Sequence, residues 1–529
     1  MTTNTSTTAN RQIARAAGTV MAAFVLSNVV GLVRQVLVAR AFGTGGPMDA
    51  FNAAITIPDV LFNLMAGGAL ASAFVPAFTG FLAKEDREGA WKLASAVTNL
   101  ASLALALTSA LAALFAPTLV RYVLFALDHE ATPALLGTTT GLLRIILIAP
   151  TIFGVSGLVM SILNTHQKFW LPALAPVFYW IGWILGLVLF VPTMGIYGLA
   201  WGYVLGAILH LAIQLPDLVK LAGRRYFPTL GVSNPAVGEV ARLMAPRLVG
   251  VAAVQLNFVI NTMVAASLGT GSISAIKVAI MLMTMPLFAI AQSVATAALP
   301  TFSAQVARGE IDEMRASLVS TLRGILLLAI PATVGLILLR QPVVTMLFQR
   351  GAFDATSTEL TAWALLWYTA GLVGHSVVEI LSRAFYALHD TKTPVVVGTA
   401  AMTLNAIFSF IFPGIFSSVG WLPLGGLALA NSLATALEAT ILVLLMRRRL
   451  KGLNGADIAK GVGQFTLAAL GMALALLFWI KSVGSLNPWL VGLGGVAAGG
   501  LVYGLGVMLL KVPEIQSVIG FLKRRIHHT

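Results

Sequence analysis

Apolar stretches of about 20 residues recur along the whole of this chain, and no other feature constrains its fold as strongly. A helix of that length crosses the ~30 Å hydrocarbon core of a bilayer. No polar segment between the stretches is long enough to form a soluble domain. Hydrophobic residues make up 58% of the chain and charged residues 10%, and the mean hydropathy is +0.91. The sequence therefore predicts an all-α polytopic membrane protein.

Breaks at Gly, Pro and charged residues divide these stretches into 14 predicted transmembrane helices. They start near Ala17, Asp49, Ala90, Pro133, Trp170, Gly195, Gly238, Gly271, Arg315, Glu359, Pro394, Gly420, Gly461 and Asn487. An even number of spans places both termini on one side. If that side is cytoplasmic, cytoplasmic loops and adjoining helix ends hold 23 of the 33 Lys and Arg residues, against 5 on the other side. The positive-inside rule therefore predicts cytoplasmic termini.

The net charge of +14 is spread over these short loops, where topology and anionic lipid headgroups account for it. We therefore expect no nucleic-acid partner. The absence of cysteine excludes disulfides and thiolate metal sites. No Walker A, HExxH or nucleophile-elbow motif occurs, and the seven histidines are scattered. We therefore expect neither an enzyme nor a metal site.

Three motifs occur twice at a nearly constant spacing. The pairs are FGTG at 42–45 and LGTG at 268–271 (offset 226), ASAFVPAF at 71–78 and ATAALPTF at 295–302 (offset 224), and LNTHQKFWLP ending at Pro172 and ALHDTKTP ending at Pro394 (offset 222). Six predicted helices separate the copies, so both copies have the same orientation. This pattern predicts a parallel repeat of two six-helix lobes, an arrangement in which transporters bind substrate between the lobes.

The repeat divides the chain into five predicted parts. They are a cytoplasmic tail at 1–16, an N-lobe of six helices at 17–225, a C-lobe of six helices at 226–450, two further helices at 451–511 and a basic cytoplasmic tail at 512–529.

Several basic residues lie inside predicted spans, where a cation costs about 2.5 kcal/mol or more unless it faces a partner or a watery cavity. They are Arg34, Arg144, Arg242, Arg247 and Lys277, and the main acidic residues within spans are Asp59, Glu379 and Glu438. Glu379 can pair with Arg383 on its own helix. Two interpretations remain open for Arg34, Lys277 and Arg144, namely buried ion pairs and the lining of an anion-binding cavity. Arg242 and Arg247 can also reach the headgroups.

The excess of buried cations favours an anionic ligand, and a diphosphate fits well. Guanidinium groups form forked hydrogen bonds with phosphate oxygens, and Lys277 would add a point charge. Asp49, which precedes an apolar run, either caps the second helix or belongs to this site.

Five segments together resemble the MurJ/MviN family of lipid II flippases. They are ARAFGTGGPMDAFNAAITIPDVLFNLMAGGALASAFVPAF (39–78), SILNTHQKFWLPALAP (161–176), PRLVGVAAVQLNFVINTMVAASLGTGSIS (246–274), LFQRGAFDATST (347–358) and RAFYALHDTKTPV (383–395). The family belongs to the multidrug/oligosaccharidyl-lipid/polysaccharide exporter superfamily, whose members have two six-helix lobes. Its flippases add two helices that form a lipid-tail groove, which implies this role for residues 451–511.

The resemblance implies that the protein moves lipid II, the undecaprenyl-diphosphate-linked precursor of peptidoglycan, from the cytoplasmic to the outer leaflet of the bacterial inner membrane by alternating access. Lipid II and membrane lipids are then its ligands, and cell-wall synthesis enzymes are candidate protein partners. No cofactor is expected. The driving force stays open between a sodium ion, a proton and the membrane potential.

The resemblance also assigns candidate substrate-binding residues. Arg34 falls on an arginine of the family's first helix, and Asp49 on its acidic residue before the second helix. Three family arginine positions differ here, at Asn28, Phe62 and Met281.

Other cations can compensate for these losses. Lys277 lies four residues before Met281, on the same helical face, and we expect it to replace the missing cation. Arg144 or Arg247 can make up for Phe62.

The missing arginines keep two alternatives open. One is a flippase for another undecaprenyl-diphosphate oligosaccharide, and the other is a non-transporting membrane scaffold for cell-wall synthesis. A cation-coupled drug exporter is a more distant alternative, because its cavity should favour carboxylates over Arg and Lys.

Overall fold

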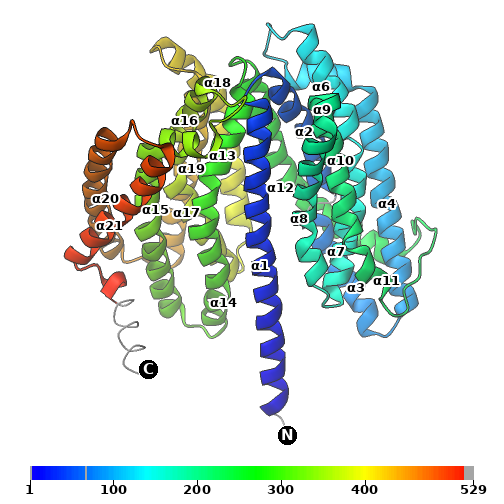
Figure 1. Ribbon diagram of the computed structural model, residues 1–529. Helices are drawn as coiled ribbons and strands as arrows, with labels where there is room; N and C mark the ends of the chain where they lie inside the picture. Colours follow the sequence, from blue (N-terminus) through cyan, green and yellow to red (C-terminus); the bar gives the residue numbers. More distant parts are fainter. Residues whose placement is uncertain (1–2, 66–67, 517–529) are drawn as a thin grey trace. The chain divides into compact units, whose positions relative to one another are not determined.

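The computed structural model describes the backbone of residues 3–65 and 68–516, and the side chains of residues 21–65, 70–245, 248 and 250–516. The described chain is helical (Figure 1). Its contacts divide it into two compact units, residues 1–270 and 271–529. Twelve of its helices are long and apolar enough to cross a membrane, or up to 14 if each of two bent pairs is one span. The predicted all-α polytopic fold is confirmed, and the predicted count of 14 is reached when both bent pairs are counted.

The first unit contains the helices up to residue 266. They are α1 (Thr3–Phe42), α2 (Gly46–Met65), α3 (Gly68–Ala83), α4 (Arg87–Leu114), α5 (Ala116–Leu119), η1 (Val120–Leu124), α6 (Pro133–Ile146), α7 (Ala149–Thr165), α8 (Trp170–Leu185), η2 (Gly186–Phe190), α9 (Val191–Met194), α10 (Ile196–Ala212), α11 (Leu215–Val219) and α12 (Pro235–Ala266).

The second unit contains the remaining helices. They are α13 (Ser272–Leu287), η3 (Phe288–Gln292), α14 (Ser293–Ala307), α15 (Ile311–Phe348), α16 (Ala355–Thr369), α17 (Leu372–Ala387), α18 (Lys392–Ser418), α19 (Leu424–Arg449), α20 (Gly455–Val483) and α21 (Pro488–Leu509). The elements labelled η are short π-helical segments.

Three helices begin with a polar residue followed by proline. Thr132, Asn234 and Asn487 are the N-caps of α6, α12 and α21, and each side chain accepts a hydrogen bond from a backbone N–H of the first turn, at 3.2, 3.0 and 2.9 Å. The following proline suits the first helical position because its fixed φ is helical and it has no N–H to satisfy. These local signals set where the helices begin.

Left-handed residues mark equivalent turns in both copies of the repeat. The pairs, with their φ angles, are Gly43 (61°) and Gly269 (98°), Glu85 (59°) and Gly309 (76°), and Gln167 (57°) and His389 (58°). Their separations of 226, 224 and 222 residues are those of the three repeated motifs. Such φ values are uncommon outside glycine, so their recurrence confirms the repeat at the level of the backbone.

The repeat extends to helix packing. In the first unit α2 packs on α6, α3 on α4 and α7, and α8 on α10. In the second unit α13 packs on α16, α14 on α15 and α17, and α18 on α19. Each unit therefore builds the same bundle in the same chain order.

Helix α12 packs within the first unit. Its residues Val237 and Val240 join an apolar cluster with Phe74, Phe78 and Trp91 of α3 and α4. In the repeat, α12 is the first helix of the second copy. The predicted boundary between residues 225 and 226 describes the repeat and stays a prediction, whereas the contacts group residues up to 270 together.

Glycines bring α8 and η2 against α10. A Cβ atom added at Gly182 would lie 2.2 Å from the Cα of Gly206, and one added at Gly186 would lie 2.2 Å from the Cα of Gly202. No side chain fits at these distances, so the two backbones touch. Small residues allow this close approach between membrane helices, where dispersion contacts replace the hydrophobic effect. The crossing fixes the position of α8 within the unit.

Helices α20 and α21 pack against α15 in the second unit (Figure 1). The Tyr503 hydroxyl of α21 donates a hydrogen bond to the Leu327 carbonyl of α15 at 2.7 Å. At the end of the pair, Arg323 of α15 forms an ion pair with Glu514 and donates from Nη1 to the Asp457 carbonyl at 2.6 Å. The C-terminal helices are thus fastened to α15 by both apolar and polar contacts.

Removing one member of this ion pair should destabilise the second unit. The side chains of Arg323 and Glu514 are 12% and 20% exposed, so Glu514→Gln should lower the free energy of unfolding by about 1–3 kcal/mol, between the values for surface and buried pairs. The matched control is Asp312→Asn, because Asp312 pairs with Arg315 but is 91% exposed. Thermal unfolding in detergent measures both, and equal shifts for the two variants would contradict the prediction.

Candidate functional site

Arg34, on α1, lies in a corner formed by two tryptophans of α8. Its guanidinium carbon is 4.5 Å from the ring centroids of both Trp180 and Trp183. The two rings have centroids 6.2 Å apart and an interplanar angle of 64°. Nε of Arg34 is buried and has no hydrogen-bond partner among the described residues. The positive charge is therefore met by two aromatic faces, in cation–π contacts.

The sequence of α8 places these rings together. Tyr179, Trp180 and Trp183 follow one another at helical spacing and so occupy one side of α8. On α1, Gly31 lies one turn before Arg34, and a Cβ added there would be 3.3 Å from Nε1 of Trp180. The absence of a side chain at Gly31 lets the indole lie against α1.

An aromatic framework holds Trp180 and Trp183 in place. Trp183 is 4% exposed, meets Phe51 edge to face at 5.3 Å and contacts Tyr203 at 5.5 Å between centroids. Tyr179 packs on Trp180 at 4.5 Å. Phe153 of α7 packs on Tyr179 at 5.2 Å. The rings around Arg34 are thus supported from α2, α7 and α10.

A carboxylate lies within the same network. The Tyr203 hydroxyl donates a hydrogen bond to Oδ1 of Asp59 at 3.2 Å, and the Tyr203 ring contacts Trp183. Within residues 21–65 and 70–516, apart from three masked side chains of α12, the structure records no ion pair between Arg34 and a carboxylate. For the described part of the chain, the expected alternative of a buried ion pair at Arg34 is therefore not observed.

Phe62 extends the aromatic framework. Its ring centroid is 5.4 Å from that of Phe153, which itself contacts Tyr179. The position that the family resemblance assigns to an arginine is therefore used here for packing.

Two further predicted residues lie on α1 and α2. Asn28 is exposed, and its Nδ2 donates to the Phe24 carbonyl at 2.8 Å. Asp49 is 4% exposed and lies in the first turn of α2, where the helix dipole favours a carboxylate. The helix already begins at Gly46, so Asp49 lies inside it and not at its N-cap.

The remaining predicted cations lie in other places. Arg144 is exposed in the last turn of α6, and its Nε donates to the Ala113 carbonyl in the last turn of α4 at 3.1 Å. It satisfies one of the carbonyls that a helix end leaves without a partner. The side chain of Arg247 lies outside the described residues. Lys277 is half-buried on α13, in the second unit, one turn before Met281.

A hydrogen-bonded cluster of three polar side chains lies beside this aromatic framework and was not predicted. Nε2 of Gln214 donates to Oγ of Ser156 at 2.7 Å, and the same Oγ is 2.7 Å from Nδ1 of His210. Phe153 packs against His210 at 5.5 Å.

Sequence reasoning also missed the aromatic residues around Arg34. The signal available was the dense run YWIGW at 179–183, whereas the partners expected for Arg34 were carboxylates or an anionic ligand.

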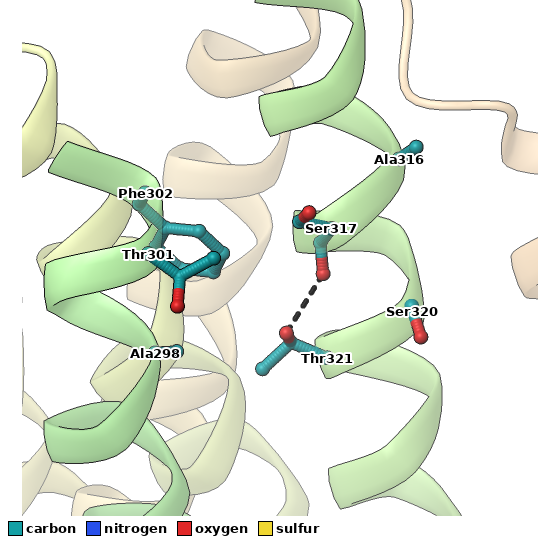
Figure 2. A pocket seen from close by; sticks show the side chains of 7 residues that line it. All are labelled: Ala298, Thr301, Phe302, Ala316, Ser317, Ser320 and Thr321. Atoms are coloured by element: carbon teal, nitrogen blue, oxygen red, sulfur yellow. Dashed lines mark hydrogen bonds between the residues drawn. The ribbon is translucent and has the colours of Figure 1, made fainter. Parts of the chain in front are cut away.

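A cavity of about 440 Å³ lies between α14 and α15 (Figure 2). It is lined by Ala298, Thr301, Phe302, Ala316, Ser317, Ser320 and Thr321. The Thr321 hydroxyl donates to the Ser317 carbonyl at 2.7 Å, and Nε2 of Gln305 donates to Oγ of Ser317 at 2.8 Å. No lining residue is charged, so this cavity offers hydroxyl groups but no cation to a phosphate.

The arrangement at Arg34 suits the binding of an anion. Guanidinium carries five N–H donors and no acceptor, and cation–π contacts stabilise its charge without a hydrogen-bond acceptor. Among the residues that the structure describes, no group of three or more His, Asp or Glu side chains could hold a metal ion.

Comparison with known proteins places this chain in a family. The family model described as lipid II flippase MurJ matches residues 38–493 of the chain. The chain belongs to the MurJ family. Arg34 lies just before the matched range.

Curated MurJ proteins are similar along most of the chain. The lipid II flippase MurJ of Burkholderia cenocepacia is 33% identical over 444 residues, which cover 82% of this chain and 84% of that protein. A probable lipid II flippase MurJ of Vibrio cholerae is 30% identical over 522 residues, which cover 94% of this chain and 95% of that protein.

The chain is also similar to solved structures. A lipid II flippase MurJ in an inward closed conformation has a TM-score of 0.79 and 27% identity, and the match covers 94% of this chain and 99% of that chain. An inward-facing multidrug resistance transporter of the MATE family and the MOP superfamily has a TM-score of 0.68 at 17% identity, and the match covers 81% of this chain and 96% of that chain. The second match shows a shared fold alone.

Proposed function

We propose that this protein is a lipid II flippase, which moves the undecaprenyl-diphosphate-linked peptidoglycan precursor from the cytoplasmic to the outer leaflet by alternating access. The observation that carries this proposal is the MurJ family match over residues 38–493. The named activity of the Burkholderia relative and the internal repeat of the bundle support it. The protein transports its ligand without converting it chemically and uses no cofactor.

The proposed binding mode divides the substrate between two environments. The diphosphate headgroup binds Arg34, and Lys277 supplies the second cation in place of the arginine missing at Met281. The polyprenyl tail stays in lipid along α20 and α21, because only the polar headgroup needs shielding from hydrocarbon. Apolar residues of these helices are highly exposed, among them Leu474 (71%), Phe478 (74%), Leu501 (69%) and Leu509 (82%).

Secondary roles are proposed for the other candidate residues. Asp49, Asn28 and Arg247 contribute polar groups to the substrate path, and Arg144 contributes through its contact with the end of α4. Both termini are cytoplasmic. A sodium ion, a proton or the membrane potential drives the cycle, and cell-wall synthesis enzymes are the proposed protein partners.

Complementation tests the proposed function. A bacterium depleted of its own lipid II flippase and expressing this protein should grow, and its lipid II should become accessible to a lipid II-cleaving enzyme added outside the cells. Growth without accessible lipid II would favour the scaffold alternative. Failure to restore either one, with the protein present in the membrane, would contradict lipid II transport. Purified protein should also bind lipid II in preference to a neutral glycolipid and to another undecaprenyl-diphosphate oligosaccharide.

A further inference from the structure

The contacts of Arg34 differ from those of an ordinary buried cation. A buried arginine is usually paired with a carboxylate, which accepts hydrogen bonds from its N–H groups. Here the guanidinium faces the rings of Trp180 and Trp183, both at 4.5 Å. Cation–π attraction comes from the ring quadrupole and does not need a hydrogen-bond acceptor. The charge is thus stabilised while the groups that recognise phosphate are kept for a ligand.

The two rings also restrict where the guanidinium can lie. They are three residues apart on one helix and meet at an interplanar angle of 64°, so they approach the cation from two directions. Trp183 is 4% exposed and braced by Phe51, and Trp180 rests on α1 at Gly31. A side chain with four rotatable torsions is therefore held by rigid groups, and less rotamer entropy is lost when a ligand binds.

We propose that Trp180 and Trp183 are positioning residues, which hold Arg34 in a fixed orientation and leave its N–H donors available to the diphosphate of the substrate. This inference rests on the proposed function. It adds that recognition of the diphosphate depends on aromatic rings that do not themselves bind phosphate, and that a ring face, and not merely an apolar side chain, is required at these two positions.

Binding of lipid II to the full-length purified protein, measured by native mass spectrometry, tests the proposal. Trp180→Leu should weaken binding by about fivefold to thirtyfold, the range expected for a lost cation–π contact. Trp180→Phe should restore most of it, because the ring face returns. In the Arg34→Gln background, Trp180→Leu should have no further effect. The control is Trp170→Leu, at the exposed start of the same helix, which should bind like wild type.

Three outcomes would overturn the positioning role. They are unchanged binding by Trp180→Leu, equal loss in Trp180→Phe and Trp180→Leu, and the same loss in the Arg34→Gln background, which would mean that the ring touches the ligand directly. Because Trp183 is buried, Trp183→Phe should be compared with Trp183→Leu after equal thermal stability is established. If wild-type protein fails to bind lipid II, or Arg34→Gln binds as tightly as wild type, the proposed function of the site fails, and this inference fails with it.

Discussion

Arg34→Gln should lower the affinity for lipid II by about tenfold to a hundredfold, the loss expected when a charged, forked hydrogen-bond donor is removed from a phosphate. Glutamine keeps a polar side chain but has neither the positive charge nor the fork. Lipid II transport, assayed by complementation, should fall in parallel. The variant also loses the cation–π contacts with Trp180 and Trp183. It should still fold, because in the described structure Arg34 makes no ion pair whose loss would leave a buried carboxylate unpaired.

Arg40→Gln is the matched control for this measurement. Arg40 lies on the same helix, in its last turn, and is exposed. Its replacement removes the same charge without changing Arg34, Trp180 or Trp183. The affinity for lipid II should therefore stay within about twofold of wild type. If both variants lose affinity equally, the effect of Arg34 is one of overall charge and not of a specific contact.

Gly186→Ala should destabilise the first unit by about 3 kcal/mol, the upper range for overpacking of a tight interior. The added Cβ would lie 2.2 Å from the Cα of Gly202, and this neighbour is backbone, which cannot rotate away. Helices α8 and α10 would have to separate, and the tryptophans of α8 would move with them. Loss of thermal stability in detergent should therefore be accompanied by weaker lipid II binding.

Gly137→Ala provides the comparison. Gly137 lies inside α6, and a Cβ added there has no atom within 4 Å. Alanine is the better helix former, so this variant should be unchanged or more stable by up to about 1 kcal/mol. A similar loss of stability in both variants would show that the effect comes from the loss of glycine flexibility and not from the crossing.

Much of the fold was accessible from the sequence because its signals are local. Apolar length predicted the spans, and residue pairs such as Asn234 and Pro235 started helices where they occur. The repeated motifs predicted the parallel repeat, which the left-handed residues Gln167 and His389 at equivalent turns confirm. Each of these features can be recognised in the sequence without knowing which helices pack together.

The site was predicted less completely. The sequence singled out Arg34 as a cation that needs an explanation, since an intramembrane charge is costly wherever it lies. Its partners could not be named, because they depend on which helix packs on α1. The hydrogen bond from Arg144 to the end of α4 was likewise not predictable, because it requires that α4 and α6 end side by side.

The sequence by itself determined that this is a membrane protein, where its helices lie, its internal repeat and its family resemblance. The membrane spans could be predicted because bilayer thickness and backbone hydrogen bonding impose length and composition on each of them. The tertiary structure alone decided how the intramembrane arginine is accommodated. Glycines allow α8 to pack closely on α10, and Gly31 allows Trp180 to lie on α1. Because of this packing, two aromatic rings that are distant in the sequence contact Arg34. Contacts of this kind follow from the shape of the packed helices, which no local pattern encodes.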